Sequence, residues 1–175
     1  MVEALLARVP RLRLAVSATT RARRPGERDG RHYWFLTDDE FDRCLRQGDF
    51  LEYHVFPWGQ RSGTLRSELT RIASEGAVPL LELELNGALA VKEREPAAVT
   101  IFVDAPLSEL ERRLRERATE SAGEIEERVA LAGEQKASAS SFDYVVENDE
   151  RERAAGECVA IVERYLRNPA TLARR

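Results

Sequence analysis

The sequence is poor in cysteine and lacks long apolar runs, and each shortage excludes a class of protein. Its two cysteines, Cys44 and Cys158, lie far apart and show neither C-x-x-C nor zinc-ligand spacing, so we expect two reduced thiols outside the chemistry. No run reaches the roughly eighteen apolar residues of a membrane span, and residues 1–10 lack the features of a secretory signal. These absences predict a cytoplasmic protein with no membrane partner.

Lysine is also scarce, and the chain carries no excess of positive charge. Only Lys92 and Lys136 are lysines among 27 basic residues, and the formal net charge is -4. Non-specific nucleic-acid binding depends on a global positive charge, so we expect no nucleic-acid partner and a phosphate ligand that is held locally. Arginine suits bidentate capture of phosphate, but coding bias gives the same skew, so only the positions of individual arginines count as evidence.

What is present fits one globular domain over residues 1–175, with 43% hydrophobic and 33% charged residues. Strand and helix patterns alternate, which predicts an α/β fold with parallel pairing, and the aromatic strands between 33 and 63 indicate a small antiparallel insertion. We expect helices at 2–8, 37–46, 64–74, 107–117, 120–139 and 150–166, strands at 12–16, 33–35, 50–56, 78–85, 97–103 and 144–146, a polar loop at 17–31 and a turn-rich connection at 57–63.

The first candidate site is the polar loop that begins at Ser17 and leads to Tyr33. It places Arg21, Arg23 and Arg24 directly after a group of hydroxyl side chains. Guanidinium groups and hydroxyls together can surround one phosphate. An exposed, solvated arginine loop has the same composition, so the pattern alone leaves both interpretations open.

The second candidate site consists of acids. Glu82 and Glu84 lie two apart on the predicted strand 78–85, so both side chains share one face, and Glu52 ends the segment FLE. Two carboxylates on an otherwise apolar strand are costly unless donors match them, which suggests a ligand or a metal-bound nucleotide. An edge strand with one solvated face is the alternative.

The third candidate site is rich in arginine and lies on predicted helices. Arg113 and Arg117 are four residues apart on one helical face, and Arg128 follows on the next helix. Such an arrangement can bring several positive charges over a phosphate chain, as mobile lids do. A surface helix face with intrahelical ion pairs is the simpler alternative.

Five segments taken in order resemble guanylate kinase: VSATTRARRPGERDGRHYWF, FLEYHVFPWGQRSGT, LLELELNGALAVK, ERRLRERATES with Arg128, and VVEND. The resemblance runs from about Leu5 to Leu166. It implies a parallel-sheet nucleoside monophosphate kinase core, a GMP-binding insertion over 33–63 and a helical lid region over 107–139.

The resemblance also implies roles for single residues, with ATP as phosphate donor and Mg²⁺ as its ion. A carboxylate at Glu52 suits guanine, because it accepts from N1–H and the exocyclic amine, whereas adenine presents an acceptor at N1; we therefore expect Glu52 to reject AMP. The implied set is Arg21, Arg24 and Tyr33 for the GMP phosphate, Ser17, Glu52, Thr64 and Glu84 around guanine, Glu82 near the phosphates and magnesium, Arg113, Arg117 and Arg128 as lid and catalytic arginines, and Asn148 near the adenine of ATP.

The chain departs from the family in three places. No G-x-x-x-x-G-K-[ST] motif occurs, so the phosphate-binding loop and the core strand before it are missing. A sheet without that strand has unpaired edges, so it closes up, recruits another segment of the chain or pairs with a second copy in a homodimer. Ser62 stands where the family usually has a further phosphate-binding tyrosine, and Glu84 stands where it has an aspartate.

The leading hypothesis is a guanylate-kinase-like protein without a P-loop that binds GMP and transfers phosphate from ATP, giving GDP and ADP, with the lid arginines in place of the loop. One alternative is a catalytically silent pseudokinase that senses GMP or binds a phosphopeptide, although the presence of Glu52 and Thr64 argues against phosphopeptide docking alone. Another is an N-terminally truncated form of an ordinary guanylate kinase whose translation starts upstream of Met1.

Overall fold

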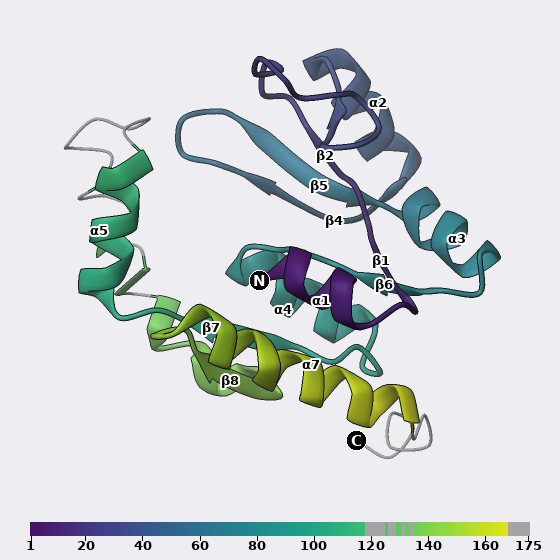
Figure 1. Ribbon diagram of the computed structural model, residues 1–175. Helices are drawn as coiled ribbons and strands as arrows, with labels where there is room; N and C mark the ends of the chain where they lie inside the picture. Colours follow the sequence, from purple (N-terminus) through teal and green to yellow (C-terminus); the bar gives the residue numbers. More distant parts are fainter. Residues whose placement is uncertain (118–124, 126–128, 131, 134, 168–175) are drawn as a thin grey trace. The chain divides into compact units, whose positions relative to one another are not determined.

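The computed structural model describes residues 1–117, 125, 129–130, 132–133 and 135–167 (Figure 1). The chain divides into two compact units, one formed by Val2 with Leu6–Glu95 and the other by Met1, Glu3–Leu5 and Pro96–Arg175. Each unit contains a pair of parallel strands together with helices, which confirms the predicted α/β class.

Most of the predicted elements are found, with shifted ends. The helices are α1 (Val2–Arg8), α2 (Asp38–Gln47), α3 (Arg66–Ser74), α4 (Leu85–Arg94), α5 (Leu107–Arg117), α7 (Arg151–Arg167) and the 3₁₀ turn η1 (Ala139–Ser141). The strands are β1 (Leu12–Leu14), β2 (Ser17–Thr19), β3 (Trp34–Phe35), β4 (Phe50–Val55), β5 (Arg61–Leu65), β6 (Val78–Leu80), β7 (Ile101–Asp104) and β8 (Tyr144–Glu147).

A four-stranded sheet in the order β3-β2-β5-β4 dominates the first unit (Figure 1). Strand β5 is antiparallel to both of its neighbours, while β2 and β3 are parallel. Helix α2 contributes Phe41 to a core cluster with Ala18 and Phe50, and the ring centroids of Phe41 and Phe50 lie 4.4 Å apart. Two predictions are wrong here, because the expected loop 17–31 begins with β2 and the expected connection 57–63 already contains the start of β5.

Helix α2 is capped at both ends by residues beside it in the sequence. The Thr37 hydroxyl accepts a hydrogen bond from the Glu40 N–H, and the Glu40 carboxylate accepts one from the Thr37 N–H. Gly48 ends the helix with a φ of 72°, a left-handed conformation that glycine adopts without steric cost. The predicted helix 37–46 is therefore confirmed with ends shifted by one residue, and it holds Phe41 against the sheet.

The predicted strand 78–85 is wrong beyond Leu80. Strand β6 pairs with β1 only from Val78 to Leu80, and the chain then leaves the sheet and enters α4. Glu84 caps this helix, because its carboxylate accepts a hydrogen bond from the Gly87 N–H at 2.6 Å. Glu82 and Glu84 therefore do not share one face of a strand. Helix α4 was not predicted, because its N-cap, Glu84, is not one of the residues that commonly begin a helix.

In the second unit, β7 and β8 form a parallel pair, and α7 contacts β8. Ala154, Ala155 and Cys158 give α7 its buried side. The predicted strands 97–103 and 144–146 and the helices 107–117 and 150–166 are confirmed within a few residues. Half of the predicted helix 120–139 lies outside the described residues.

Two general features complete the description. Both cysteines are free, as expected. Among the residues that the structure describes, no helix combines the length and the apolar character needed to cross a bilayer.

Candidate functional site

A row of polar side chains crosses three strands of the four-stranded sheet. Ser17 on β2 lies opposite Thr64 on β5, and Thr64 lies opposite Glu52 on β4. Residues that are far apart in the sequence thus become neighbours through strand register. Three of the residues that the resemblance assigns to guanine are brought together in this row.

Glu52 is the chemically distinctive member of the row. Its side chain is only 5% exposed, and the Thr64 hydroxyl donates a hydrogen bond to its Oε1 at 2.8 Å. Burial raises the pKa of Glu52, hydrogen bonds from Thr64 oppose that rise, and the negative charge of Glu84 adds to it. An ionised carboxylate has about four acceptor sites. Glu52 therefore keeps capacity for the donors of a ligand beyond its hydrogen bonds with Thr64.

Two glycines make room for Glu52. A Cβ on Gly63 would lie 2.6 Å from the backbone oxygen of Glu52, and a Cβ on Gly87 would lie 2.7 Å from its Oε2. Both distances are far below a normal carbon–oxygen contact, so neither position accepts a side chain without movement of Glu52. The first turn of α4 is thus shaped to fit this carboxylate.

Glu84 lies close to the same carboxylate. A Cβ on Gly87 would be 3.5 Å from Glu84 Oε1, so both acids border this glycine. Glu84 Oε1 also lies 3.5 Å from Nδ1 of His54, two residues after Glu52 on β4. His54 was not predicted as a site residue. It lies two residues from Glu52 on the same strand, and this spacing places both side chains on one face.

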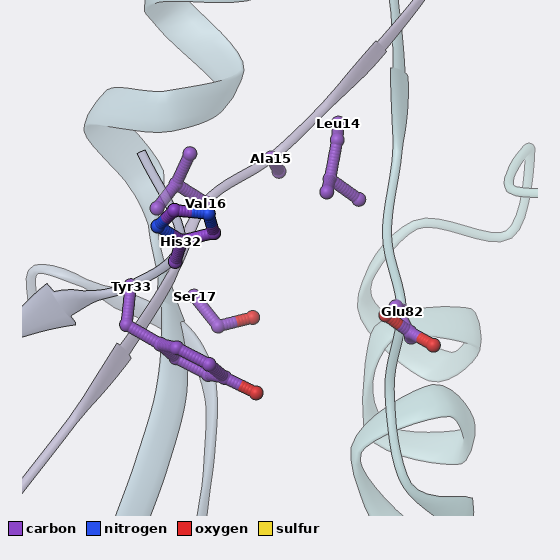
Figure 2. A pocket seen from close by; sticks show the side chains of 7 residues that line it. All are labelled: Leu14, Ala15, Val16, Ser17, His32, Tyr33 and Glu82. Carbon is purple, nitrogen blue, oxygen red and sulfur yellow. The ribbon is translucent and has the colours of Figure 1, made fainter. Parts of the chain in front are cut away.

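Ser17 also lines a cavity of about 120 Å³ together with Tyr33 and Glu82, two further residues that the resemblance singled out (Figure 2). Figure 2 shows Ser17 and the Tyr33 ring near one another, with Glu82 contributed by the segment after β6. His32, which the sequence analysis missed, lines the cavity as well, and its Nδ1 accepts a hydrogen bond from the Arg28 N–H at 2.8 Å. The other lining residues are Leu14, Ala15 and Val16.

Arg21 is held by a carboxylate and by aromatic rings. Its guanidinium makes hydrogen bonds of 2.7 and 3.0 Å to the two oxygens of Glu27, and it lies 5.2 Å from the ring centroid of Tyr33 and 5.7 Å from that of Phe35. Hydrogen bonds from Arg21 and from the Arg24 N–H lower the pKa of Glu27 to about 2. The Glu27 carboxylate therefore occupies an anion position between these arginines. Sequence reasoning missed Glu27.

The remaining predicted residues lie in the second unit. Asn148 follows β8, and its N–H donates to the carbonyl oxygen of Asp104 at 2.6 Å. Arg113 and Arg117 lie four residues apart on α5, as predicted, but the structure describes only their backbone. Arg128 lies outside the described residues, so its predicted place on a second lid helix stays a prediction.

A buried carboxylate beside hydroxyls, together with an arginine loop and parallel strand pairs, defines an α/β protein of the nucleotide-binding class. The sequence profile of the guanylate kinase family matches residues 1–166. The chain belongs to the guanylate kinase family.

Individual relatives agree with this assignment. The guanylate kinase of Rubrobacter xylanophilus is 45% identical over 167 residues, which cover 95% of this chain and 87% of that protein. The guanylate kinase of Symbiobacterium thermophilum is 40% identical over 174 residues, covering 97% and 82%. The crystal structure of guanylate kinase from Anaplasma phagocytophilum has a TM-score of 0.74 at 27% identity and covers 92% of this chain and 79% of that one.

Proposed function

We propose that this chain binds GMP and catalyses phosphoryl transfer from ATP to GMP, giving GDP and ADP. The observation that carries the proposal is the row of Ser17, Thr64 and Glu52, in which Thr64 and Glu52 are buried. Ionised Glu52 accepts hydrogen bonds from the N1–H and the exocyclic amine of guanine. Adenine presents an acceptor at N1, and an acceptor facing a buried carboxylate leaves both groups unsatisfied, so AMP is rejected.

The phosphate of GMP is received by the loop of Arg21, Arg24 and Tyr33. Arginine binds phosphate and carboxylate with the same fork geometry, so the phosphate replaces the Glu27 carboxylate at Arg21. Glu84 joins Glu52 at the base, since both border Gly87. Each of these contacts uses a group in the first unit.

The cavity also offers the kind of ligand that magnesium prefers. Its oxygen donors include the Glu82 carboxylate, and Mg²⁺ is usually held by one or two carboxylates together with substrate phosphates. We assign Glu82 as the carboxylate that would hold the ion, directly or through water. When bound, Mg²⁺ neutralises phosphate charge.

For the transfer itself, an oxygen of the GMP phosphate attacks the γ-phosphorus of ATP, and the bond from that phosphorus to the leaving ADP oxygen breaks. The 175 residues contain no G-x-x-x-x-G-K-[ST] motif. We therefore assign neutralisation of the transferring phosphate to Arg113, Arg117 and Arg128, because phosphoryl transfer depends mainly on positioning and on positive charge. Asn148 is assigned to the adenine of ATP.

A calorimetric titration of the purified chain with GMP, and with AMP as the control ligand, tests the first half of the proposal. We expect binding of GMP and none of AMP. Failure to bind either nucleotide would overturn it. A phosphopeptide that displaces GMP with comparable affinity would indicate a docking protein instead.

The second half is tested by GDP formation from GMP and ATP after trace host kinase has been removed. We expect Arg113→Ala and Arg128→Ala each to lower the rate by on the order of 10³, the lower end of the range for an arginine that stabilises transferring phosphate. Activity that neither substitution changes would contradict a catalytic role for the lid arginines.

A further inference from the structure

Glu68 is a buried acid that the proposed chemistry does not use. It lies in the first turn of α3, and it is 3% exposed. Ionised side chains are rarely buried to this extent unless partners surround them. The identity of those partners therefore indicates what the residue is for.

The two oxygens of Glu68 accept hydrogen bonds from three residues. Oε2 accepts from the backbone N–H of Val16 at 2.9 Å, and Oε1 accepts from the indole Nε1–H of Trp34 at 3.3 Å. Arg71, one turn further along α3, donates to Oε1 at 3.2 Å and to Oε2 at 2.8 Å. Each oxygen thus has one partner from Arg71 and one from a distant part of the chain.

The two distant partners flank the loop 17–33, whose first three residues form β2. Val16 directly precedes Ser17, and Trp34 directly follows Tyr33. Between these ends lie Arg21 and the other residues of the proposed phosphate site. Val16, Ser17 and Tyr33 also line the cavity that contains Glu82 (Figure 2). One carboxylate on α3 therefore connects the entry and the exit of the loop.

Trp34 transmits this anchoring into the loop itself. Gly30 has a φ of 69°, and a Cβ at this position would lie 3.0 Å from the Trp34 ring. The Gly30 N–H donates to the Tyr33 carbonyl at 2.9 Å, so the chain turns tightly against the indole. A shift of the indole would move Gly30 and Tyr33 together.

The charge of Glu68 is maintained despite its burial. Burial alone would raise its pKa, but the hydrogen bonds from Arg71 and from the Val16 N–H outweigh that effect, and the pKa lies below its usual value. Glu68 is therefore a carboxylate at neutral pH, and a carboxylate accepts at both oxygens.

We propose that Glu68 is a positioning residue that fixes both ends of the loop 17–33 and thereby sets the affinity for the GMP phosphate without touching GMP. The inference rests on the proposed function of this loop. If Glu68 had a purely structural role, its substitution would destabilise the fold as a whole. If it is a positioning residue, its substitution lowers the affinity for GMP alone.

The first test compares Glu68→Gln with Glu75→Gln. Glu75 is another partner of Arg71, at 2.9 Å, and its ion pairs in the described part of the chain are with Arg71 and Arg13, outside the loop. It is therefore a matched control at the C-terminal end of the same helix. The side-chain amide of glutamine places its NH₂ group opposite the N–H donor of either Val16 or Trp34. That donor then has no acceptor, so one end of the loop is no longer anchored. We expect Glu68→Gln to raise the KM for GMP about tenfold, with kcat and the KM for ATP within about twofold, and Glu75→Gln to change none of these.

The second test needs no nucleotide. The loop contains four trypsin sites, after Arg21, Arg23, Arg28 and Arg31, because trypsin does not cleave the bond between Arg24 and Pro25. Limited trypsin digestion followed by mass spectrometry should show cleavage at these sites about tenfold faster in Glu68→Gln than in the wild type or Glu75→Gln, with cleavage elsewhere unchanged. Faster loop cleavage in a chain that binds no GMP would overturn the proposed function but not the anchoring.

A third variant covers the case in which Glu68→Gln does not fold. Trp34→Phe keeps an aromatic ring on Gly30 but removes the indole donor, so it releases only one end of the loop. We expect it to raise the KM for GMP about threefold and to increase cleavage in the loop. Wild-type GMP affinity together with wild-type cleavage in whichever of these variants folds would overturn the inference.

Discussion

The buried acids of the first unit and the acids on α5 and α7 of the second unit use their charges in opposite ways. In the unit of Leu6–Glu95, Glu52 and Glu68 are buried and bonded to partners from distant parts of the chain. In the described part of the other unit, the acids of α5 and α7 lie on the surface and pair with arginines three or four residues away, as in Glu109–Arg112 and Glu111–Arg115.

The two kinds of charged interaction differ in energy and in what determines their partners. A surface pair on a helix contributes a few tenths of a kcal/mol, roughly, and its partner is fixed by the helix itself. A buried carboxylate without donors costs several kcal/mol, so its partners must be supplied by other elements. Burial with partners from other elements therefore separates Glu52 and Glu68 from the surface ion pairs of α5 and α7.

Among substitutions that compare the acids of the two units, Glu52→Gln should have the largest effect on GMP affinity. The amide presents N–H groups to the N1–H and amine donors of guanine, and hydrogen bonds to charged groups contribute about 1.5–3 kcal/mol. We expect GMP affinity to fall by about 100-fold in calorimetry. Glu157→Gln, which removes an exposed acid from α7, serves as the control and should bind GMP as the wild type does.

Two helical glycines provide a smaller but sharper comparison. Gly87 on α4 lies against the Glu52 carboxylate, whereas a Cβ on Gly156 of α7 meets no atom within 4 Å. We expect Gly87→Ala to displace Glu52 and to weaken GMP binding about tenfold. Gly156→Ala should leave binding unchanged and stabilise the protein by about 1 kcal/mol, the intrinsic preference of a helix for alanine. Thermal unfolding and GMP titration of both variants would check this, and equal GMP affinities would contradict the assigned role of Gly87.

A pH profile gives a smaller effect again. Burial raises the pKa of Glu52 above its usual value, and only the ionised form accepts both guanine donors. GMP affinity should therefore be full well above this raised pKa and should decrease as the pH falls through it. Thr64→Val removes the hydrogen bond that lowers the pKa, so it should move the decrease to higher pH. Titrations with GMP across the acid range would detect the shift, and identical profiles would contradict it.

The parts of the fold that the sequence predicted correctly are those whose signals are local. Helix α2 needs only Thr37, Glu40 and Gly48, all within or beside its own turns. Strand β2 and the end of β6 depend instead on pairing with β5 and β1, and no local pattern contains that information. The prediction failed at these places because tertiary pairing decided the structure.

The candidate site shows the same division between what local sequence signals predict and what tertiary pairing decides. The resemblance named Ser17, Glu52 and Thr64, but their alignment in one row depends on strand register, including a shift between Phe50 and Glu52. Glu68 was not predicted, because its spacing to Arg71 is that of an ordinary surface pair on a helix. Its burial arises from Val16 and Trp34, which approach from other elements.

The smallest effect should come from the surface of α5. Nη2 of Arg115 lies 2.6 Å from Oε1 of Glu111. The Arg115 side chain is 67% exposed, so water and salt screen this ion pair. Arg115→Ala should change the free energy of unfolding by about 0.5 kcal/mol or less, and less still at high salt, with GMP affinity unchanged. Chemical denaturation at low and high ionic strength would measure this. A loss of GMP affinity in this variant would mean that Arg115 contributes to the GMP site, and the contrast between buried and exposed charge would then fail as a guide to the residues that bind GMP.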